Sequence, residues 1–268
     1  MEGYIIVLDV DGTLLPSSNE IDNSLITSLH HFEEKNTIVL ASGRGYHDLA
    51  IIHDKLKLTG PIISSNGASL NFFDGTPNVT MSIRNDIVKD IFTQNRNVIE
   101  SAFFSYMQKL FIFNKLDKLN FLYKIKPESQ IIEGPFDEID LDHPNSIYFI
   151  LKNELKENFF SYCNKYNDEV EVNEFGHDQH ISIVTLNLKH TDKAYAILEL
   201  LLILKKSENK TIIFGDNYAD INMLKLNGLT IAMSNAIPEA KAQAKYITDD
   251  DNNHNGVINF LYKLEKGL

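Results

Sequence analysis

The chain has 268 residues, of which 43% are hydrophobic and 23% charged, a composition that excludes a protein disordered over its whole length. Its 37 acidic residues outnumber the 25 lysines and arginines, which gives a net charge of −12. Because so acidic a surface repels phosphate backbones, we expect neither a nucleic acid nor an anionic membrane as a partner.

The first part of the chain alternates between strand and helix patterns. Three continuous apolar runs predict strands buried on both faces, at 4–10, 37–41 and 61–64. Two amphipathic stripes between them, one starting after Asp22 and one spanning 49–56, predict the connecting helices. This alternation is typical of a parallel sheet with crossover helices.

The pattern changes near residue 82. Strand patterns there contain more aromatic and polar residues, at 103–114, 146–152 and 181–186, and a helical stripe covers 155–166. Half-exposed strands accompanied by helices predict an α+β module in which one face of the sheet is open.

The first pattern returns after residue 190. A strongly apolar helix is predicted over 191–205, and it is followed by further buried strands and helices, at 211–214, 221–226, 229–233, 245–248 and from 256. We therefore predict a Rossmann-like α/β core with a parallel sheet, made of 1–82 and 187–268, with an α+β module inserted at 83–186.

The sequence predicts neither a signal peptide nor a membrane-spanning segment. Its first residues carry no basic region and no cleavage signal, and the most apolar stretch, 194–204, is too short to span a bilayer. We expect a soluble, cytoplasmic protein. The single cysteine, Cys163, excludes a disulfide framework and is expected to be a small buried residue.

Two acidic residues follow the first predicted strand. Alternate residues of a strand point to the same side, so Asp9 and Asp11 are expected to converge on one spot. Gly12 permits a tight turn whose backbone N–H groups could bind an oxyanion. The alternative is an ordinary turn between strand and helix, where Asp and Gly are common.

Asp216 and Asp220 follow a later core strand in the same manner. They could simply cap the next helix, but four carboxylates at one sheet edge would repel each other strongly. A divalent cation would offset that repulsion. Because the ligands are oxygens and no convincing His or Cys set is present, the ion predicted is Mg²⁺.

A second set of residues could bind a phosphate. Ser42 and Gly43 follow the second strand, and Lys193 lies in a first helical turn, where the helix dipole disfavours a cation. A solvated lysine is the alternative reading. Four further residues are candidate substrate contacts, namely Thr13, Arg44, Asn66 and Asn217.

These residues resemble the four ordered motifs of the haloacid-dehalogenase-like phosphatase superfamily. The matching segments are Asp9-x-Asp11-Gly12-Thr13, Ser42, Lys193 and Gly215-Asp216-x-x-x-Asp220. Three more segments resemble the Cof-type branch, namely 65–68, 232–236 and 255–257. The resemblance covers the core, whereas the inserted module matches a cap in position and size.

The resemblance implies a site with assigned roles. Asp9 would be the nucleophile that forms an aspartyl-phosphate, and Asp11 the general acid and base. Mg²⁺ would be held by Asp9, the backbone carbonyl of Asp11 and Asp216, with Asp220 orienting a ligand or a metal-bound water. Four residues would bind phosphoryl oxygens, namely Gly12, Ser42, Gly43 and Lys193. The substrate would be a small phosphomonoester such as a sugar phosphate.

Two positions depart from the motifs. Ala219 stands where the branch usually has an asparagine that contacts phosphate, and Ala194 follows Lys193 where a glycine is usual. Asn217 is near Ala219 without being equivalent to it. Two alternatives stay open, a phosphomutase or phosphotransferase on the same scaffold and a non-catalytic protein that binds a phosphate ligand.

Overall fold

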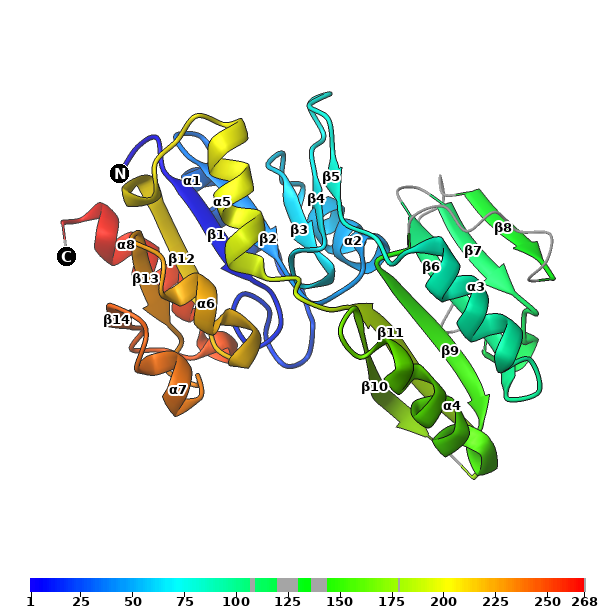
Figure 1. Ribbon diagram of the computed structural model, residues 1–268. Coiled ribbons are helices and arrows are strands. Elements are labelled where there is room, and N and C mark those ends of the chain that lie inside the picture. Colours follow the sequence, from blue (N-terminus) through cyan, green and yellow to red (C-terminus); the bar gives the residue numbers. More distant parts are fainter. Residues whose placement is uncertain (107–108, 120–129, 136–143, 178, 268) are drawn as a thin grey trace. The chain divides into compact units, whose positions relative to one another are not determined.

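Figure 1 shows the computed structural model of the chain, which describes residues 1–106, 109–119, 130–135, 144–177 and 179–267. The chain forms two compact units. The first comprises Met1–Arg44, Leu49–Val79 and Asp192–Leu268, and the second comprises Gly45–Asp48 and Thr80–Thr191. Each unit contains its own sheet.

The first unit is built on an eight-stranded sheet of order β14-β13-β12-β1-β2-β3-β4-β5. Its strands are β1 (Ile5–Asp9), β2 (Thr37–Ala41), β3 (Ile62–Ser64), β4 (Ser69–Asn71), β5 (Val79–Thr80), β12 (Thr211–Gly215), β13 (Leu229–Ala232) and β14 (Tyr246–Ile247). β1 is central and runs parallel to both neighbours, with Leu8 paired to Leu40 and Phe214. The predicted α/β class is confirmed, although β4 is antiparallel to β3, which the sequence did not predict.

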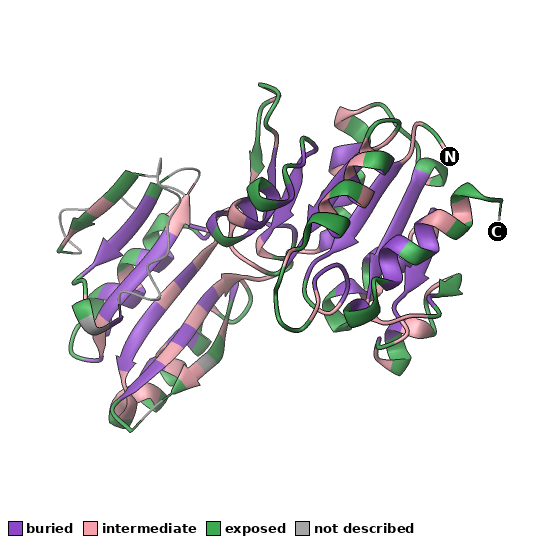
Figure 2. Ribbon diagram, turned by 180° about the vertical axis from the view of Figure 1, so that it is seen from behind, coloured by how far each residue is buried: buried purple, intermediate pink, exposed green. Residues whose placement is uncertain are grey.

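Helices cover both faces of this sheet. They are α1 (Asn23–Glu33), α2 (Tyr46–Leu56), α5 (Lys193–Ile203), α6 (Ile221–Leu224), α7 (Pro238–Lys241) and α8 (Gly256–Glu265). In the view of Figure 1, α5 and α6 lie in front of the sheet, and α1 and α8 lie behind it. Val7 and Ile213 pack in one cluster with Leu200 of α5. All five residues of β1 are buried, as the purple strands of Figure 2 illustrate.

The remaining short helices are single 3₁₀ turns. In the first unit they are η1 (Ser65–Gly67), η6 (Glu208–Lys210), η7 (Tyr218–Asp220) and η8 (Asn252–His254). In the second unit they are η2 (Asp117–Leu119), η4 (Asn153–Leu155) and η5 (Asn164–Tyr166). η1 directly follows β3, and η7 comes shortly after β12, at the edge where parallel strands end and ligands commonly bind.

The second unit has a six-stranded sheet of order β10-β11-β9-β6-β7-β8. Its elements are α3 (Asn85–Gln94), β6 (Ile99–Tyr106), β7 (Lys109–Phe113), β8 (Gln130–Gly134), β9 (Ser146–Lys152), α4 (Lys156–Cys163), β10 (Val170–His177) and β11 (Ile181–Leu188). α3 and α4 pack on one face with a cluster that includes Phe149 and Cys163. The opposite face carries a second buried cluster, which includes Phe103 and Ile150.

Several predictions for this segment were wrong in detail. The single strand expected at 103–114 is the antiparallel pair β6 and β7, and α3 was not predicted. The face expected to be open is partly buried, because Phe103 and Ile150 gather there. The predicted boundary after residue 186 falls inside β11. That residues 83–186 act as a cap stays a prediction.

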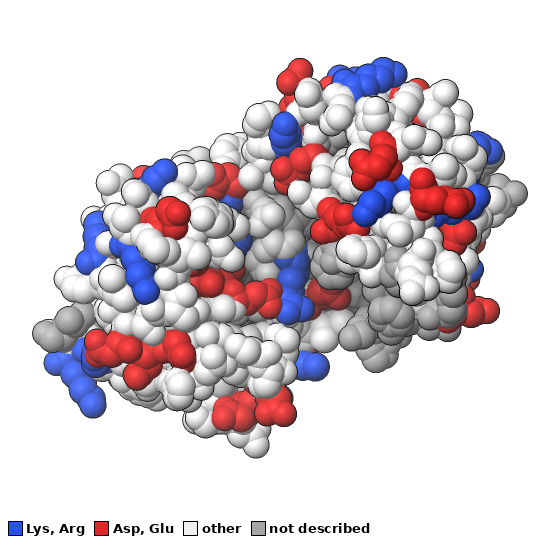
Figure 3. All heavy atoms as spheres, turned by 90° about the horizontal axis from the view of Figure 1, so that it is seen from below, with Lys and Arg blue, Asp and Glu red and all other residues white. Residues whose placement is uncertain are grey.

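None of the helices in the described parts of the chain has the length and apolar character required to cross a membrane. Acidic side chains are spread over the face shown in Figure 3, with lysine and arginine side chains between them.

Candidate active site

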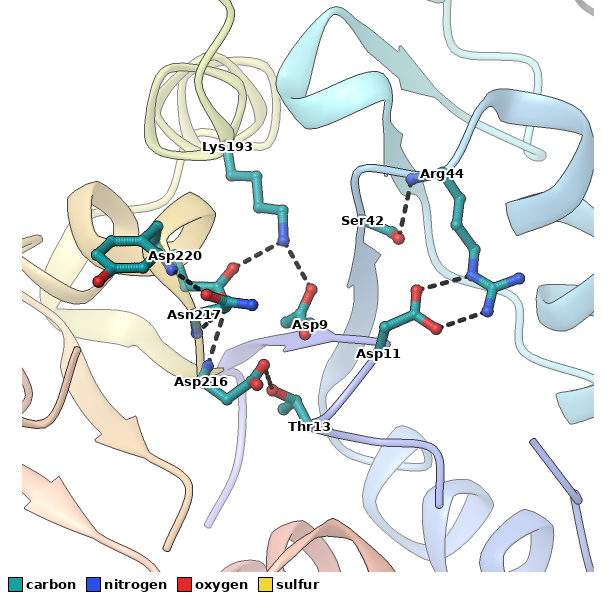
Figure 4. Close-up of polar contacts among 10 residues, drawn as sticks. Asp9, Asp11, Thr13, Ser42, Arg44, Lys193, Asp216, Asn217 and Asp220 are labelled. Atoms are coloured by element: carbon teal, nitrogen blue, oxygen red, sulfur yellow. Dashed lines mark hydrogen bonds and ion pairs between the residues drawn. The ribbon is translucent and has the colours of Figure 1, made fainter. Parts of the chain in front are cut away.

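The most deeply buried part of the site is a lysine held between two carboxylates. Asp9 is the last residue of β1, Lys193 the first of α5, and Asp220 the last of η7. The Lys193 Nζ atom donates to Asp9 Oδ1 at 2.6 Å and to Asp220 Oδ1 at 2.7 Å (Figure 4). The three side chains are almost entirely shielded from solvent, and there ion pairs interact strongly.

The position of Lys193 depends on a close contact between η1 and α5. The Asp192 side chain caps α5 by accepting from the backbone N–H of Ala194 at 2.7 Å. A Cβ atom on Gly67 would lie only 2.2 Å from the carbonyl oxygen of Asp192, and the φ of Gly67 is +96°. A glycine is therefore required for the helix to start where it places the lysine above Asp9.

Asp216 directly follows β12 and approaches the buried group formed by Asp9, Lys193 and Asp220. Its Oδ1 atom accepts a hydrogen bond from the Thr13 hydroxyl at 2.9 Å. Gly12 has a φ of +81°, and a Cβ atom there would lie 2.5 Å from Asp216 Oδ2. Gly12 therefore allows Asp216 to come close to the turn after β1. Thr13 was a candidate substrate contact, but its buried hydroxyl holds a carboxylate instead.

Oxygens of Asp9, Asp216 and Asp220 lie within 4.8 Å of one another. This group of carboxylates could hold a metal ion. Asp9 ends β1, Asp216 directly follows β12 and Asp220 ends η7, and β1 and β12 are neighbouring parallel strands. Four carboxylates were expected to meet at this edge of the sheet, and three of them do, those of Asp9, Asp216 and Asp220.

Burial changes the ionisation of this group. Burial raises the pKa of Asp9 from 3.8 to about 7, because the lowering effect of Lys193 does not cancel it and Asp220 and Asp216 add to the rise. Burial also raises the pKa of Asp216, against the lowering effect of the hydrogen bond from Thr13. Burial lowers the pKa of Lys193, but Asp9 and Asp220 outweigh it and the net shift is upward. One lysine thus faces three carboxylates.

Asp220 is fully engaged by its neighbours. Its Oδ1 atom accepts from Lys193, and its Oδ2 atom accepts from the backbone N–H groups of Asp216 at 2.9 Å and Asn217 at 3.0 Å. Asn217 caps η7, so that Asn217 and Asp220 form a capping box. The alternative in which Asp216 merely caps the next helix is not what the structure shows, since Asn217 is the cap. Ala219 is exposed in the same turn and brings no polar side chain.

Asp11 lies on a different side of the site. β1 ends at Asp9, so the alternation of a strand does not extend to Asp11, and the expected convergence of the two carboxylates is not found. Arg44 donates to both oxygens of Asp11, from Nε at 2.7 Å and from Nη2 at 2.5 Å. In Figure 4 the Asp11 carboxylate is turned toward Arg44, while Asp9 is joined to Lys193. The Asp11 side chain is 50% exposed.

The loop after β2 lies beside this pair. The Ser42 hydroxyl is buried and accepts from the backbone N–H of Arg44 at 3.1 Å. The carbonyl oxygen of Ser42 accepts from the backbone N–H of Asn66 at 3.1 Å. A Cβ atom on Gly43 would lie 3.0 Å from Asn66 Oδ1, so Gly43 and Asn66 lie side by side. The structure therefore brings together Ser42, Gly43, Arg44 and Asn66.

Sequence reasoning missed the residues that hold the turn after β1. Asn235 donates from Nδ2 to the carbonyl oxygen of Gly12 at 2.8 Å, and its Oδ1 accepts from the backbone N–H of Asn252 at 3.2 Å. Asn252 in turn donates to the carbonyl oxygen of Leu15 at 2.8 Å. The sequence did point to Asn235, because it lies in the segment 232–236 that resembles the Cof-type branch. No role was predicted for the residues of that segment.

Comparisons with known proteins agree with this geometry. A family model described as haloacid dehalogenase-like hydrolase matches residues 6–261. The protein named Putative phosphatase MG265 of Mycoplasma genitalium is 30% identical, over 98% of this chain and 99% of its own length. The protein named 5-amino-6-(5-phospho-D-ribitylamino)uracil phosphatase YitU of Bacillus subtilis is 25% identical, over 96% of each chain.

Solved structures lead to the same family. A haloacid dehalogenase-like hydrolase from Bacteroides thetaiotaomicron superposes with a TM-score of 0.80 at 25% identity, covering 98% of this chain and all of the other. A protein of Thermotoga maritima superposes with a TM-score of 0.82 at 23% identity, covering 97% of each chain, which shows the shared fold. The chain therefore belongs to the haloacid dehalogenase-like hydrolases, in their Cof-type branch, and is an enzyme of the phosphatase type.

Proposed function

We propose that the chain hydrolyses small phosphomonoesters with the help of Mg²⁺ through an aspartyl-phosphate on Asp9. The observation that supports this most is the buried contact of Asp9 with Lys193 at 2.6 Å. The lysine fixes one carboxylate oxygen and supplies positive charge at the place where a phosphoryl group would meet Asp9. A protein that only bound phosphate would have no use for a carboxylate beside that charge.

The acidic group fits Mg²⁺ by its chemistry. All of its side-chain donors are carboxylate oxygens, which magnesium prefers. The raised pKa of Asp9 indicates that Lys193 alone does not balance the carboxylates. We assign Asp9, Asp216 and the backbone carbonyl of Asp11 as ligands. Asp220, whose oxygens are already engaged, orients the lysine and the loop that carries Asp216. When bound, the ion would neutralise charge on the phosphoryl oxygens.

In the first step, an oxygen of Asp9 forms a bond to phosphorus while the bond to the ester oxygen breaks. The ester oxygen takes the electron pair and accepts a proton from Asp11, so that the product departs as an alcohol. Lys193 donates to the phosphoryl oxygens as charge builds on them. The buried Ser42 hydroxyl and the N–H groups of Gly12 and Gly43 are assigned to the same oxygens.

In the second step, water attacks the aspartyl-phosphate. Asp11 takes a proton from the water while the water oxygen forms a bond to phosphorus. The bond between phosphorus and Asp9 breaks, and its electron pair returns to the Asp9 carboxylate. Inorganic phosphate then leaves, and Asp11 is protonated for the next cycle. A side-chain amide at position 219 is not part of this scheme, so Ala219 is compatible with it.

The name of one relative supports a substrate class. YitU is named for a phosphate ester of a ribityl chain, a polyol attached to a pyrimidine ring. We propose a phosphomonoester of sugar or polyol size for this chain, selected by residues 83–186 acting as a cap.

The test is phosphate release from a panel of small phosphomonoesters, with Mg²⁺ and with EDTA. The wild type should release phosphate with Mg²⁺ only. Asp9→Asn should reduce the rate by at least ~10³-fold, because the nucleophile is lost. Asp249→Asn is a matched control in an exposed loop of the same unit and should keep the wild-type rate. No release from any ester by folded wild type that binds Mg²⁺ would reject the proposal. Adding an acceptor alcohol separates hydrolysis from transfer.

A further inference from the structure

The pair formed by Arg44 and Asp11 conflicts with the proposed role of Asp11. A general acid must carry a proton to the departing oxygen. In the structure both oxygens of Asp11 accept hydrogen bonds from one guanidinium, at 2.7 and 2.5 Å. A carboxylate held in this bidentate way has both oxygens occupied by the guanidinium and turned away from Asp9. Arg44 must therefore release Asp11 before the ester can be protonated.

We propose that Arg44 is a specificity residue, which releases Asp11 when it pairs with a second anionic group on the substrate. The preferred substrates are then phosphomonoesters whose alcohol part carries a carboxylate or another acidic group. This inference rests on the proposed function, and it adds the class of alcohol.

The position of Arg44 indicates that it would bind the alcohol part of the substrate and not the transferred phosphoryl group. In Figure 4 the guanidinium lies beyond Asp11, whereas Lys193 meets Asp9. Asp11 is assigned to the ester oxygen, so a group beyond it faces the alcohol part. The backbone N–H of Arg44 is bonded to Ser42, which fixes the start of the side chain near the phosphate loop.

The accessibility of the pair makes an exchange of partners feasible. The Arg44 side chain is 33% exposed and that of Asp11 is 50% exposed. An ion pair this open to water contributes little to stability, so a substrate anion can replace Asp11 at small cost. The net charge of −12 also means that a second anion needs a local cation. A guanidinium fork matches a carboxylate or a phosphate equally well.

The experiment compares two three-carbon esters that differ at one end. 3-Phosphoglycerate carries a carboxylate where glycerol 3-phosphate carries a hydroxymethyl group. With Mg²⁺, the wild type should show a kcat/KM at least tenfold higher for 3-phosphoglycerate. Arg44→Ala should reduce this ratio to about one, by lowering kcat/KM for 3-phosphoglycerate and raising kcat for glycerol 3-phosphate. Arg44→Lys keeps the charge without the fork and should give an intermediate ratio.

The control is Lys206→Ala, which removes an exposed cation of the first unit and should keep the wild-type ratio. Equal losses for both esters in Arg44→Ala would overturn the proposal, because Arg44 would then serve the transferred phosphoryl group or position Asp11. A wild type without preference would overturn it as well, and so would a wild type that hydrolyses p-nitrophenyl phosphate but neither three-carbon ester. If no ester at all is hydrolysed, the proposed function fails and this inference fails with it.

Discussion

Asp9 and Asp11 are two residues apart, yet they lie in opposite environments. Asp9 is 5% exposed and shares a lysine with Asp220. Asp11 is half exposed and pairs with an arginine at the surface. The strand ends between them, so one side chain stays under the helix α5 and the other leaves the sheet.

This difference shows how burial decides what an ion pair does. A buried pair cannot be separated cheaply, because each partner would be left charged in a medium that solvates it poorly. An exposed pair exchanges partners with water and with ligands. The first arrangement suits a nucleophile that must not move, and the second suits an acid that must change its proton and its partner. The following predictions test that contrast.

The largest effect is expected from removing the buried cation. Lys193→Met keeps the side-chain volume but leaves Asp9 and Asp220 without their partner, so we expect a loss of about 3–5 kcal/mol in the free energy of unfolding. Urea denaturation measures it. Lys206→Ala, at an exposed position, is the matched control and should change stability by less than about 0.5 kcal/mol. If the free energy of unfolding fell as little in Lys193→Met as in this control, the buried ion pairs would be no harder to break than exposed ones, and the contrast drawn above would be wrong.

Within the buried group around Lys193, Asp9 should contribute most to the pH dependence of the free energy of unfolding. Its pKa is about 7 in the folded protein, against an ordinary value of 3.8, so the folded protein keeps the proton to higher pH than the unfolded chain does. The stability that this group contributes is complete below about pH 4 and is lost as the pH rises through about 7, at up to about 1.4 kcal/mol per pH unit. Unfolding of metal-free wild type and Asp9→Asn, compared from pH 4 to 8, should reveal a steeper slope in the wild type, because Asp216, whose pKa is also raised, still contributes in the variant. Mg²⁺ should flatten it.

A smaller effect is expected from crowding Asp216. Gly12→Ala and Gly75→Ala both place a side chain at positive φ, +81° and +90°, which costs about 1 kcal/mol each. Only the first also places a Cβ atom 2.5 Å from Asp216, since Gly75 has nothing within 4 Å. Mg²⁺-dependent activity should fall in Gly12→Ala and stay at the wild-type level in Gly75→Ala. Equal activity in both variants would mean that Asp216 does not need its present position.

The smallest effect on stability is expected at the exposed pair. A double-mutant cycle with Arg44→Ala and Asp11→Asn should give a coupling energy of at most about 1 kcal/mol. Thermal or urea unfolding of the four proteins provides the numbers. A coupling of several kcal/mol would mean that Arg44 holds Asp11 permanently, which would also count against the exchange of partners proposed above.

The sequence predicted the frame of the site well, because the buried strands carry an unambiguous pattern. β2 was predicted with its observed limits, and Asp22 caps α1 as expected by accepting from Leu25 at 2.7 Å. Parallel strands end at one edge, so the meeting of Asp9 and Asp216 followed from the order of elements alone.

What the sequence could not show are the contacts made across long separations in the chain. The bond from Arg44 to Asp11 depends on where a strand stops, and the periodicity of side chains does not mark that point within two residues. The hydroxyl of Thr13 was available to substrate or to protein, and only the approach of Asp216 decides between them. In the second unit one long strand was predicted where the structure has the antiparallel pair β6 and β7, because no glycine or proline interrupts the sequence there.

The strand order has a consequence for how the protein is made. β1 pairs on one side with β2, which follows soon after it, and on the other side with β12, which begins at Thr211. During synthesis the N-terminal strands leave the ribosome first, and this second edge of β1 has no partner until the inserted module has been translated. Lys193, Asp216 and Asp220 arrive equally late. A nascent chain therefore carries Asp9, the proposed nucleophile, long before the residues that contact it have been synthesised.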